Sequence, residues 1–213
     1  MSTHTSFDSL ERRLRAGAEG SAEDGGASAA RLVERAAAEG LLDVAYATAD
    51  TPLGPLLVAG TRRGLVRVAF PHERPDDVLA ALARDVSPRV LESPGELDPV
   101  RRELGEYFEQ RRERFDLPLD WRLTRGFRRD VLKATARIPY GGTVTYSEIA
   151  GRAGSPRAHR AAGSALGSNP IPLVVPCHRV VRAGGAIGNY GGGPEVKEFL
   201  LRLEGALGGL SRE

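Results

Sequence analysis

Hydrophobic and polar residues follow different patterns in successive parts of the chain. Residues 1–43 contain two stretches with helical spacing, SLERRLRAG and SAARLVERAAAEGLL, with the small polar segment GAEGSAEDGGAS between them. Residues 44–70, VAYATADTPLGPLLVAGTRRGLVRVAF, are β-branched runs broken by turn signals at Thr51–Gly54 and Thr61–Gly64. The pattern therefore predicts a helical or partly disordered extension over residues 1–43, followed by three short strands.

Two helices and a further strand are expected next. The segment DDVLAALARDV has its apolar residues on one side, which predicts a helix, and a strand is expected around Val90 and Leu91. Asp98-Pro99 has the form of an N-cap followed by proline at the first helical position. The helix that follows has the apolar stripe Val100, Leu104, Tyr107 and Phe108. Residues 44–121 are thus predicted to form a small α/β domain.

Residues 122–213 are predicted to form a second, mainly helical domain. Its first helix has apolar residues at Phe127, Val131, Leu132 and Ala134 and ends before Ile138-Pro139. TYSE, residues 145–148, has the form of a capping box and begins a short helix that ends near Arg152. Ser155-Pro156 is expected to begin the next helix, after a turn that contains Gly154. This spacing is typical of a helix-turn-helix motif.

The end of the chain is predicted to contain a hairpin and a last helix. VVRAGGAIGNYGGG has the form of a β-hairpin that turns at Gly184-Gly185, with a glycine-rich loop around Asn189 and Tyr190. A hairpin after a helix-turn-helix motif gives a winged arrangement. Gly193-Pro194 begins the last helix and Gly205 ends it. The expected core face of that helix is Val196, Phe199, Leu200 and Leu203.

Composition changes this picture little. The 41% hydrophobic content can support real cores, and 27% charged residues is ordinary for a soluble protein. A single cysteine excludes an internal disulfide framework and favours a reducing compartment. The chain starts without an apolar segment of signal-peptide length, and it contains no apolar run of about 18 residues. We therefore expect a soluble, intracellular protein without a membrane partner.

The distribution of charge says more than the net charge of +2. From Ile149 to Pro194 there is no Asp or Glu. The same stretch contains Arg152, Arg157, Arg160, Arg179 and Arg182, with His159 and His178. A long stretch with cations alone, in a nearly neutral protein, favours a face that meets an anion. The alternative is a solvated face that happens to lack acidic residues.

The second helix of the predicted motif, PRAHRAAGSALGSN, has almost no bulky side chain. Each of its two internal glycines costs about 1 kcal/mol relative to alanine, so a compensating contact is expected. Close packing against another helix is one explanation. The other is a backbone that must approach a large partner, with Arg157 and Arg160 as its projecting groups. Arginines at the start of a helix oppose the helix dipole unless they face phosphates, which favours the second explanation.

Cys177, the only cysteine, lies in the apolar run IPLVVPCHRVV, and four roles are open to it. It can be an inert core residue, which is the default for an isolated cysteine. Metal ligation is disfavoured because there is no second cysteine and the four histidines show no ligand spacing. A Cys–His hydrolase is possible, but neighbours in an extended run point to opposite sides, so His178 would need a water or a turn to reach the thiol. The fourth role is a nucleophile that attacks a group brought to it by the basic helical face.

The residues around Cys177 carry a family resemblance. PCHRVV at 176–181, the preceding GSNPIPLVV, GNYGGG at 188–193 and VKEFLLRLEG at 196–205 resemble the O6-alkylguanine-DNA alkyltransferases, also called methylated-DNA–protein-cysteine methyltransferases. TYSEIA at 145–150 and TPLGPLLVA at 51–59 also fit, so the match covers residues 44 to about 205. The resemblance implies an α/β fold class: a small N-terminal strand–helix domain of RNase H-like type, then a mainly helical winged helix-turn-helix domain.

The resemblance also implies catalytic roles. Cys177 would accept the alkyl group from guanine O6 and keep it. His178 would act as the base through a bridging water, and Glu204 would orient the imidazole and strengthen it as a base. Asn169 would hold the turn around the active-site segment by hydrogen bonding. No cofactor and no metal are expected.

Further roles concern DNA. By resemblance, Arg160 would enter the base stack and fill the space left by an extruded nucleotide, and Tyr146 would press on the neighbouring phosphate. Other expected DNA contacts are Ser155, Arg157, Ala161 and Gly163, and the expected pocket walls are Tyr190, Asn189, Gly191 and Pro172. Gly191 departs from the family pattern, in which a serine is common at this position. The absence of this serine predicts a roomier pocket that tolerates alkyl groups larger than methyl.

The resemblance therefore implies a suicidal DNA repair methyltransferase that uses base flipping, with each molecule accepting one alkyl group from O6-alkylguanine in double-stranded DNA. A monomer in the cytoplasm, nucleoid-associated when bound to DNA, is expected. The alternative is a winged-helix regulator, or an alkyltransferase-like protein that marks lesions without removing them. Such relatives replace the cysteine, whereas PCHR is intact here. A Cys–His hydrolase lacks support from any oxyanion-hole or cleft signature.

Overall fold

The structure is a computed structural model that describes residues 42–209. The extension predicted over residues 1–43 therefore lies almost entirely outside the described residues. Within them, no helix has the length and apolar character needed to cross a membrane.

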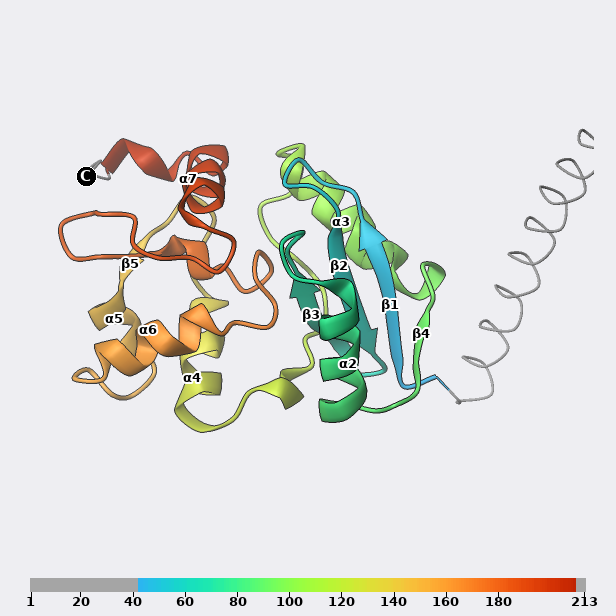
Figure 1. Cartoon of the computed structure of the whole chain (residues 1–213). Helices are drawn as coiled ribbons and strands as arrows, with labels where there is room; N and C mark the ends of the chain where they lie inside the picture. Colours follow the sequence, from blue (N-terminus) through green and yellow to red (C-terminus); the bar gives the residue numbers. More distant parts are fainter. Residues whose placement is uncertain (1–41, 210–213) are drawn as a thin grey trace, which may run out of the picture. The chain divides into compact units, whose positions relative to one another are not determined.

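A four-stranded sheet forms the core of the first half (Figure 1). Its strands are β1 (Val44–Ala49), β2 (Leu56–Thr61), β3 (Gly64–Ala69) and β4 (Val90–Glu92), in the order β3-β2-β1-β4. β1 and β3 are antiparallel to β2, and β4 is parallel to β1. The predicted strands and both tight turns are confirmed; the Gly54 amide, for example, donates to the Thr51 carbonyl at 2.9 Å.

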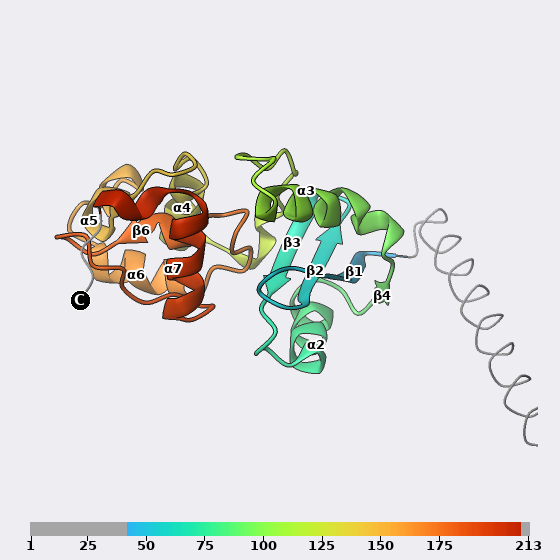
Figure 2. The same ribbon diagram turned by 90° about the horizontal axis from the view of Figure 1, so that it is seen from above.

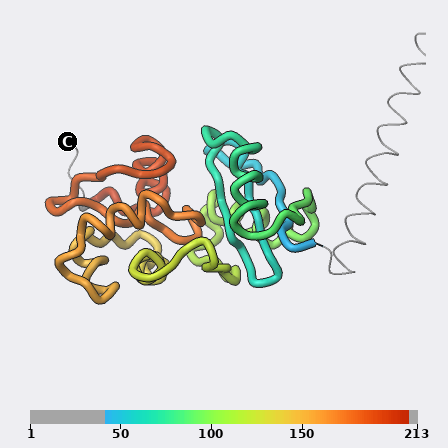
Figure 3. The backbone as a smooth tube through the Cα atoms, turned by 60° about the horizontal axis from the view of Figure 1, so that its bottom comes forward, coloured from blue at the N-terminus to red at the C-terminus, as the bar shows by residue number. Residues whose placement is uncertain are grey.

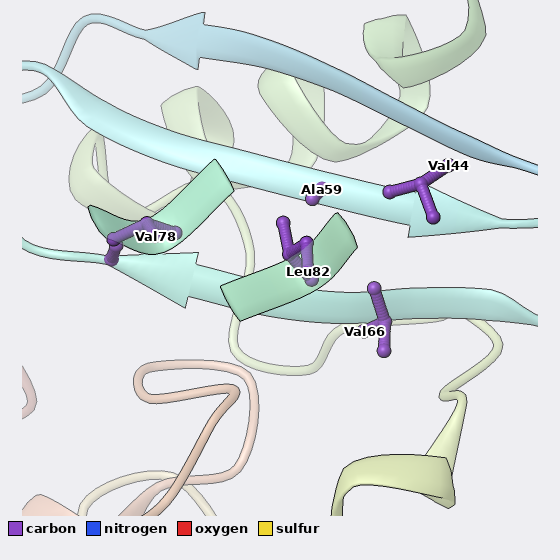
Figure 4. Packing of buried hydrophobic residues seen from close by; sticks show 6 residues of the cluster. Val44, Ala59, Val66, Val78 and Leu82 are labelled. Atoms are coloured by element: carbon purple, nitrogen blue, oxygen red, sulfur yellow. The ribbon is translucent and has the colours of Figure 1, made fainter. Parts of the chain in front are cut away.

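Two helices lie on opposite faces of this sheet, as Figure 2 shows. On one face, α2 (Pro75–Asp85) packs Val78 and Leu82 against Val44, Ala59 and Val66 of the strands (Figure 4). α3 (Asp98–Phe108) follows a 3₁₀ turn, η1 (Gly95–Leu97), and buries the whole predicted apolar stripe. The expected N-cap at Asp98 is wrong. Asp98 is already helical, and its carboxylate binds Arg101 instead of a backbone amide.

The segment between the two halves is attached to the edge of the sheet. Leu65 on β3 donates its amide to the Pro118 carbonyl at 2.8 Å and accepts from the Asp120 amide at 2.9 Å. Gly64 allows this approach: it has φ +124°, and a β-carbon there would lie 2.1 Å from the Pro118 carbonyl oxygen. The segment then forms η2 (Trp121–Leu123) and leads into the helical half.

The second half is mainly helical. Its elements are α4 (Gly126–Thr135), β5 (Val144–Thr145), α5 (Tyr146–Arg152), α6 (His159–Gly167), η3 (Cys177–Arg179), β6 (Val180–Val181), α7 (Pro194–Leu203) and η4 (Ala206–Gly209). α4 and α5 match the prediction, and the capping box at Thr145 and Glu148 is present. In the backbone trace of Figure 3, the orange segment with α6 and η3 runs beside the red segment with α7. α7 contacts η3, so the last helix supports the turn that carries Cys177.

Three predictions about this half are corrected. α6 begins at His159 and not at Pro156, because residues 155–158 close a separate turn in which the Ala158 amide donates to the Ser155 carbonyl. The hairpin turn forms after Arg182, whose amide donates to the Ala186 carbonyl at 2.8 Å, but the described residues after it, 187–209, contain no strand. β6 pairs with β5 in parallel, and the positive φ of +72° at Gly188 bends the chain out of an extended path.

The third correction concerns the buried face of α7. Lys197, Leu200 and Leu201 are buried, whereas Phe199 is 37% exposed and Val196 is only partly buried. The helix is rotated relative to the prediction, and Lys197 can lie on the buried face because it has an acceptor there. Its ammonium donates to the Val180 carbonyl at 2.6 Å.

Candidate functional site

Cys177 lies in a turn and not in an extended strand. The Cys177 amide donates to the Val175 carbonyl at 2.8 Å, and residues Cys177–Arg179 form the 3₁₀ turn η3. Just before it, Leu173 is fully buried with φ +71°, a left-handed conformation that costs a leucine about 1 kcal/mol or more. The expectation that Cys177 and His178 project to opposite sides of an extended run is therefore wrong, because the backbone turns at Cys177.

Asn169 joins this turn to the end of α6. Its side-chain oxygen accepts from the Ile171 amide at 3.0 Å, and its amide nitrogen donates to the Val175 carbonyl at 2.8 Å. The same nitrogen lies 3.1 Å from Sγ of Cys177. A single buried side chain thus fixes the turn geometry and donates a hydrogen bond to the sulfur.

The thiol is buried and neutral at physiological pH. Burial raises the pKa of Cys177 to about 11, against the lowering effects of the Asn169 hydrogen bond and the Lys197 charge. Burial also lowers the pKa of Lys197 to about 8, although the Cys177 sulfur favours the charged ammonium. The thiol therefore needs a base to become a nucleophile, and a cation lies near enough to favour the thiolate once it forms.

His178 is a candidate for that base. Its Nε2 lies 2.9 Å from Oε1 of Glu204, which assigns the imidazole proton to Nε2 and leaves Nδ1 as an acceptor. Burial lowers the pKa of His178 more than the Glu204 hydrogen bond raises it, so the ring is neutral at physiological pH. Nδ1 is buried and has no hydrogen-bond partner among residues 42–209.

Glu204, at the end of α7, is held from several elements. Arg179 donates from Nε to Oε2 at 2.8 Å and from Nη2 to Oε1 at 2.9 Å. The Tyr107 hydroxyl on α3 donates to Oε1 at 2.6 Å, and the Gly141 amide donates to Oε2 at 3.4 Å. Burial alone would raise the pKa of Glu204, but the His178 and Arg179 hydrogen bonds outweigh it and lower the pKa to about 2.

A cavity of about 510 Å³ opens beside the sulfur. Its lining brings together several of the predicted residues: Tyr146, Gly163, Cys177, Asn189, Tyr190 and Gly191. A second cavity, of about 370 Å³, shares Cys177, Tyr190 and Gly191 with the first. The second cavity also includes Asn169 and Pro172, together with Phe70 and His72 from the first half of the chain. A β-carbon at Gly191 would meet no atom within 4 Å, so this wall has spare room.

The remaining predicted DNA contacts lie outside both cavities. Arg157, Arg160 and Ala161 are exposed and Ser155 is partly buried. A β-carbon at Gly167 would meet nothing within 4 Å, and one at Gly163 would make an ordinary 3.8 Å contact with the Tyr146 ring. Packing between helices therefore does not require these glycines. This favours the second explanation, in which a large partner approaches the backbone of α6.

Not every cation of the acid-free stretch belongs to an exposed face. Arg179 is 5% exposed and binds Glu204 and the Ile138 carbonyl, so its expected place on a face that meets an anion is wrong. Arg152, Arg157, Arg160 and Arg182 are exposed or mostly so. The described residues hold no group of three metal-ligating side chains.

Three side chains that contact or influence Cys177, His178 or Glu204 were not predicted to do so: Lys197, Arg179 and Tyr107. Lys197 could have been found, because Lys197, Leu200, Leu201 and Glu204 share one face of α7 and a lysine there is unusual. Arg179 lies in the PCHR motif, but the resemblance gave it no role, and its charge placed it on the exposed basic face. Tyr107 gave no signal at all, because its position in an apolar stripe is ordinary and its partner Glu204 lies 97 residues away.

Comparison with known proteins agrees with this arrangement. Residues 126–206 match the family model for the 6-O-methylguanine DNA methyltransferase DNA binding domain, and residues 44–121 match its ribonuclease-like domain. A Methanosarcina barkeri protein named methylated-DNA–protein-cysteine methyltransferase is 39% identical over 160 residues, which cover 75% of this chain and 96% of the relative. An inducible protein of the same name from Bacillus subtilis is 40% identical over 149 residues, 69% of this chain and 82% of the relative.

Solved structures give the same result. The crystal structure of Mycobacterium tuberculosis OGT in complex with DNA superposes with a TM-score of 0.65 at 38% identity, covering 75% of this chain and 92% of that one. The sheet-containing first half and the helical second half thus match known structures. By matched domains, identity and coverage, the chain belongs to the 6-O-methylguanine DNA methyltransferase family.

Proposed function

We propose that this chain is a single-turnover DNA repair protein that moves an alkyl group from O6 of guanine in duplex DNA to Sγ of Cys177. The observation that carries this proposal is the position of the chain's only cysteine, on the wall of a 510 Å³ cavity beside the α5–α6 motif and next to the buried His178–Glu204 pair. A cavity of this size accommodates a purine. Relatives named methylated-DNA–protein-cysteine methyltransferase support the reaction class.

The damaged nucleotide must leave the base stack, because guanine O6 is inaccessible to a buried thiol while the base is paired. We assign the outer surface of α5 and α6 to DNA binding. Arg160 would occupy the vacated space in the stack, and Tyr146, on the cavity wall, would press on the adjacent phosphate. Ser155, Arg157, Ala161 and Gly163 would contact the backbone or the groove, where the small side chains permit close approach.

The thiol proton passes through a water to Nδ1 of His178, while Glu204 stabilises the imidazolium that forms. The thiolate attacks the alkyl carbon, so an S–C bond forms as the C–O6 bond breaks. The electron pair of the broken bond returns to the base, which becomes the ordinary lactam of guanine after N1 takes up the proton. The net transfer is one alkyl group to sulfur and one proton to guanine.

The product explains why one molecule repairs one lesion. The sulfur ends in a thioether, which has no easy leaving group, and the chain has no second cysteine to remove the alkyl group. We propose that Asn169 fixes the attacking sulfur and that Tyr190, Asn189, Gly191 and Pro172 contact the extruded base. No cofactor takes part in these steps.

The two domains of the chain would have different roles in this reaction. Residues 44–121 would form a domain that supports the site, and residues 122–213 would form the DNA-binding and alkyl-acceptor domain. One extruded nucleotide needs one cavity, so a monomer is sufficient on damaged duplex.

Transfer of label from DNA to protein tests the function. Duplex that carries O6-methylguanine with an isotopic label on its methyl group is mixed with the full chain. The protein is then separated under denaturing conditions. We expect label on the protein, none with Cys177→Ser, and guanine restored in the DNA. Tight binding of damaged duplex without transfer would instead assign the chain to a lesion-marking or regulatory protein and overturn the proposal.

A further inference from the structure

The Glu204 carboxylate receives a hydrogen bond from outside the helical half of the chain. Tyr107, on α3, is 0% exposed, and its hydroxyl lies 2.6 Å from Oε1 of Glu204. The same oxygen also accepts from Nε2 of His178 and Nη2 of Arg179, each at 2.9 Å. Three donors therefore converge on one oxygen, and one of them comes from the sheet-containing half.

Packing holds the Tyr107 hydroxyl in this position. The ring contacts Phe108, Phe115 and Tyr140 with centroids 5.3, 5.2 and 6.2 Å away. A phenol enclosed by three aromatic rings has no solvent to bind, so the carboxylate is its hydrogen-bond acceptor. The contact is thus fixed by the core and does not depend on a mobile side chain.

We propose that Tyr107 is a positioning residue of the proton relay, which tunes the basicity of His178 by sharing its carboxylate partner. This inference rests on the proposed function, because it concerns the same His178 and Glu204. A carboxylate oxygen that already accepts two other hydrogen bonds attracts the imidazole proton less strongly than a carboxylate bound to His178 alone. The hydroxyl therefore keeps the proton on Nε2 and limits how readily the ring becomes charged before substrate arrives.

Other charged and polar groups surround His178 and Glu204, and each charged group favours or disfavours protonation of the imidazole. Arg179 and Lys197 disfavour imidazolium by their charge, and Glu204 favours it. Tyr140 and Tyr190 are neutral phenols near Glu204, because burial raises the pKa of each. Removing the Tyr107 hydroxyl leaves Arg179, Lys197, Tyr140 and Tyr190 in the protein and changes only the hydrogen bonding of Glu204, so its contribution can be measured separately.

The test compares the pH dependence of the reaction with free O6-benzylguanine in Tyr107→Phe and in the wild-type chain. Without the hydroxyl, Glu204 attracts the imidazole proton more strongly and His178 charges at higher pH. We expect the acid limb of the rate profile to move up by about half a pH unit to one unit. The rate on the plateau should fall by about threefold to tenfold, as the loss of one orienting hydrogen bond predicts.

Tyr140→Phe is the matched control. Its hydroxyl lies near the same site, but it donates to the Leu203 carbonyl at 3.1 Å instead of the carboxylate. We expect its acid limb to stay at the wild-type pH. The free base as substrate removes DNA binding from the measurement, and urea unfolding of both variants measures any general loss of stability.

Fluorinated tyrosine at position 107 makes the result independent of folding defects. A more acidic phenol donates more strongly, so the acid limb should move to lower pH, opposite to Tyr107→Phe. An acid limb at the wild-type pH in both altered proteins, while wild-type protein reacts, overturns the inference alone. If the wild-type chain reacts neither with the free base nor with duplex that carries O6-methylguanine, the proposed function itself is overturned.

Discussion

Glu204→Gln tests whether the buried carboxylate stabilises the fold as strongly as its environment implies. The pKa of Glu204 is lowered from 4.5 to about 2, chiefly because hydrogen bonds from His178 and Arg179 outweigh the effect of burial. This lowering corresponds to about 3 kcal/mol of folding free energy. Because the side chain is fully buried, solvent screening does not reduce this figure much. The variant should be less stable by about that amount at neutral pH.

The sign of the pH dependence follows from the folded and unfolded states. A carboxyl group whose pKa is lower in the folded state contributes stability that is fully present above its unfolded pKa of 4.5. That contribution is lost as the pH falls from about 4.5 through about 2. Urea unfolding should therefore show a large difference between wild type and Glu204→Gln at pH 7, shrinking over this acidic window.

The control for this experiment is Glu198→Gln on the same helix. Glu198 pairs with Arg202 at 2.7 Å with 38% of its side chain exposed, so its loss should cost less than about 1 kcal/mol. A Glu204→Gln difference below about 1 kcal/mol at pH 7, or one that stays constant down to pH 2, would refute the reasoning.

Three further predictions concern DNA, substrate size and the sheet. Arg160→Ala should slow repair of duplex by about tenfold or more, since the arginine offsets part of the free-energy cost of base extrusion. Its reaction with free O6-benzylguanine should stay nearly unchanged. Equal losses on both substrates would remove that role. Gly191→Ser, which meets no steric barrier, should lower the benzyl rate relative to the methyl rate, and an unchanged ratio would show that this wall does not set substrate size. Gly64→Ala should destabilise the protein by about 2 kcal/mol or more in urea unfolding, because its β-carbon would lie 2.1 Å from the Pro118 carbonyl oxygen; a smaller effect would mean that the edge segment moves aside.

Local signals in the sequence were sufficient for most of the secondary structure. The strands β1, β2 and β3 are separated by turn residues, and α5 has a complete capping box, so each element is specified by its own residues. The hairpin prediction failed because local residues do not specify which strands pair. Gly184-Gly185 specifies a turn, but the partner of β6 is β5, and pairing between distant segments leaves no local pattern.

The site was predicted where its residues are close in sequence or matched by the family motif. Cys177 and His178 are adjacent and stand out in their own stretch, and the resemblance supplied Asn169 and Glu204. The hydrogen bond from Tyr107 joins residues 97 positions apart and could not be inferred from either segment. Lys197 was missed for another reason: the predicted buried face, Val196, Phe199, Leu200 and Leu203, leaves position 197 in solvent. In the structure Lys197 is buried with its ammonium on the Val180 carbonyl.

Site-resolved mass measurement after reaction tests the central claim most directly. The full chain is incubated with excess duplex that carries O6-methylguanine, then digested and sequenced by mass spectrometry. We predict one added methyl group per molecule, located on the sulfur of Cys177, with no second addition however long the incubation. A folded, DNA-bound protein whose Cys177 stays unmodified, or a methyl group found on another residue, would contradict the account.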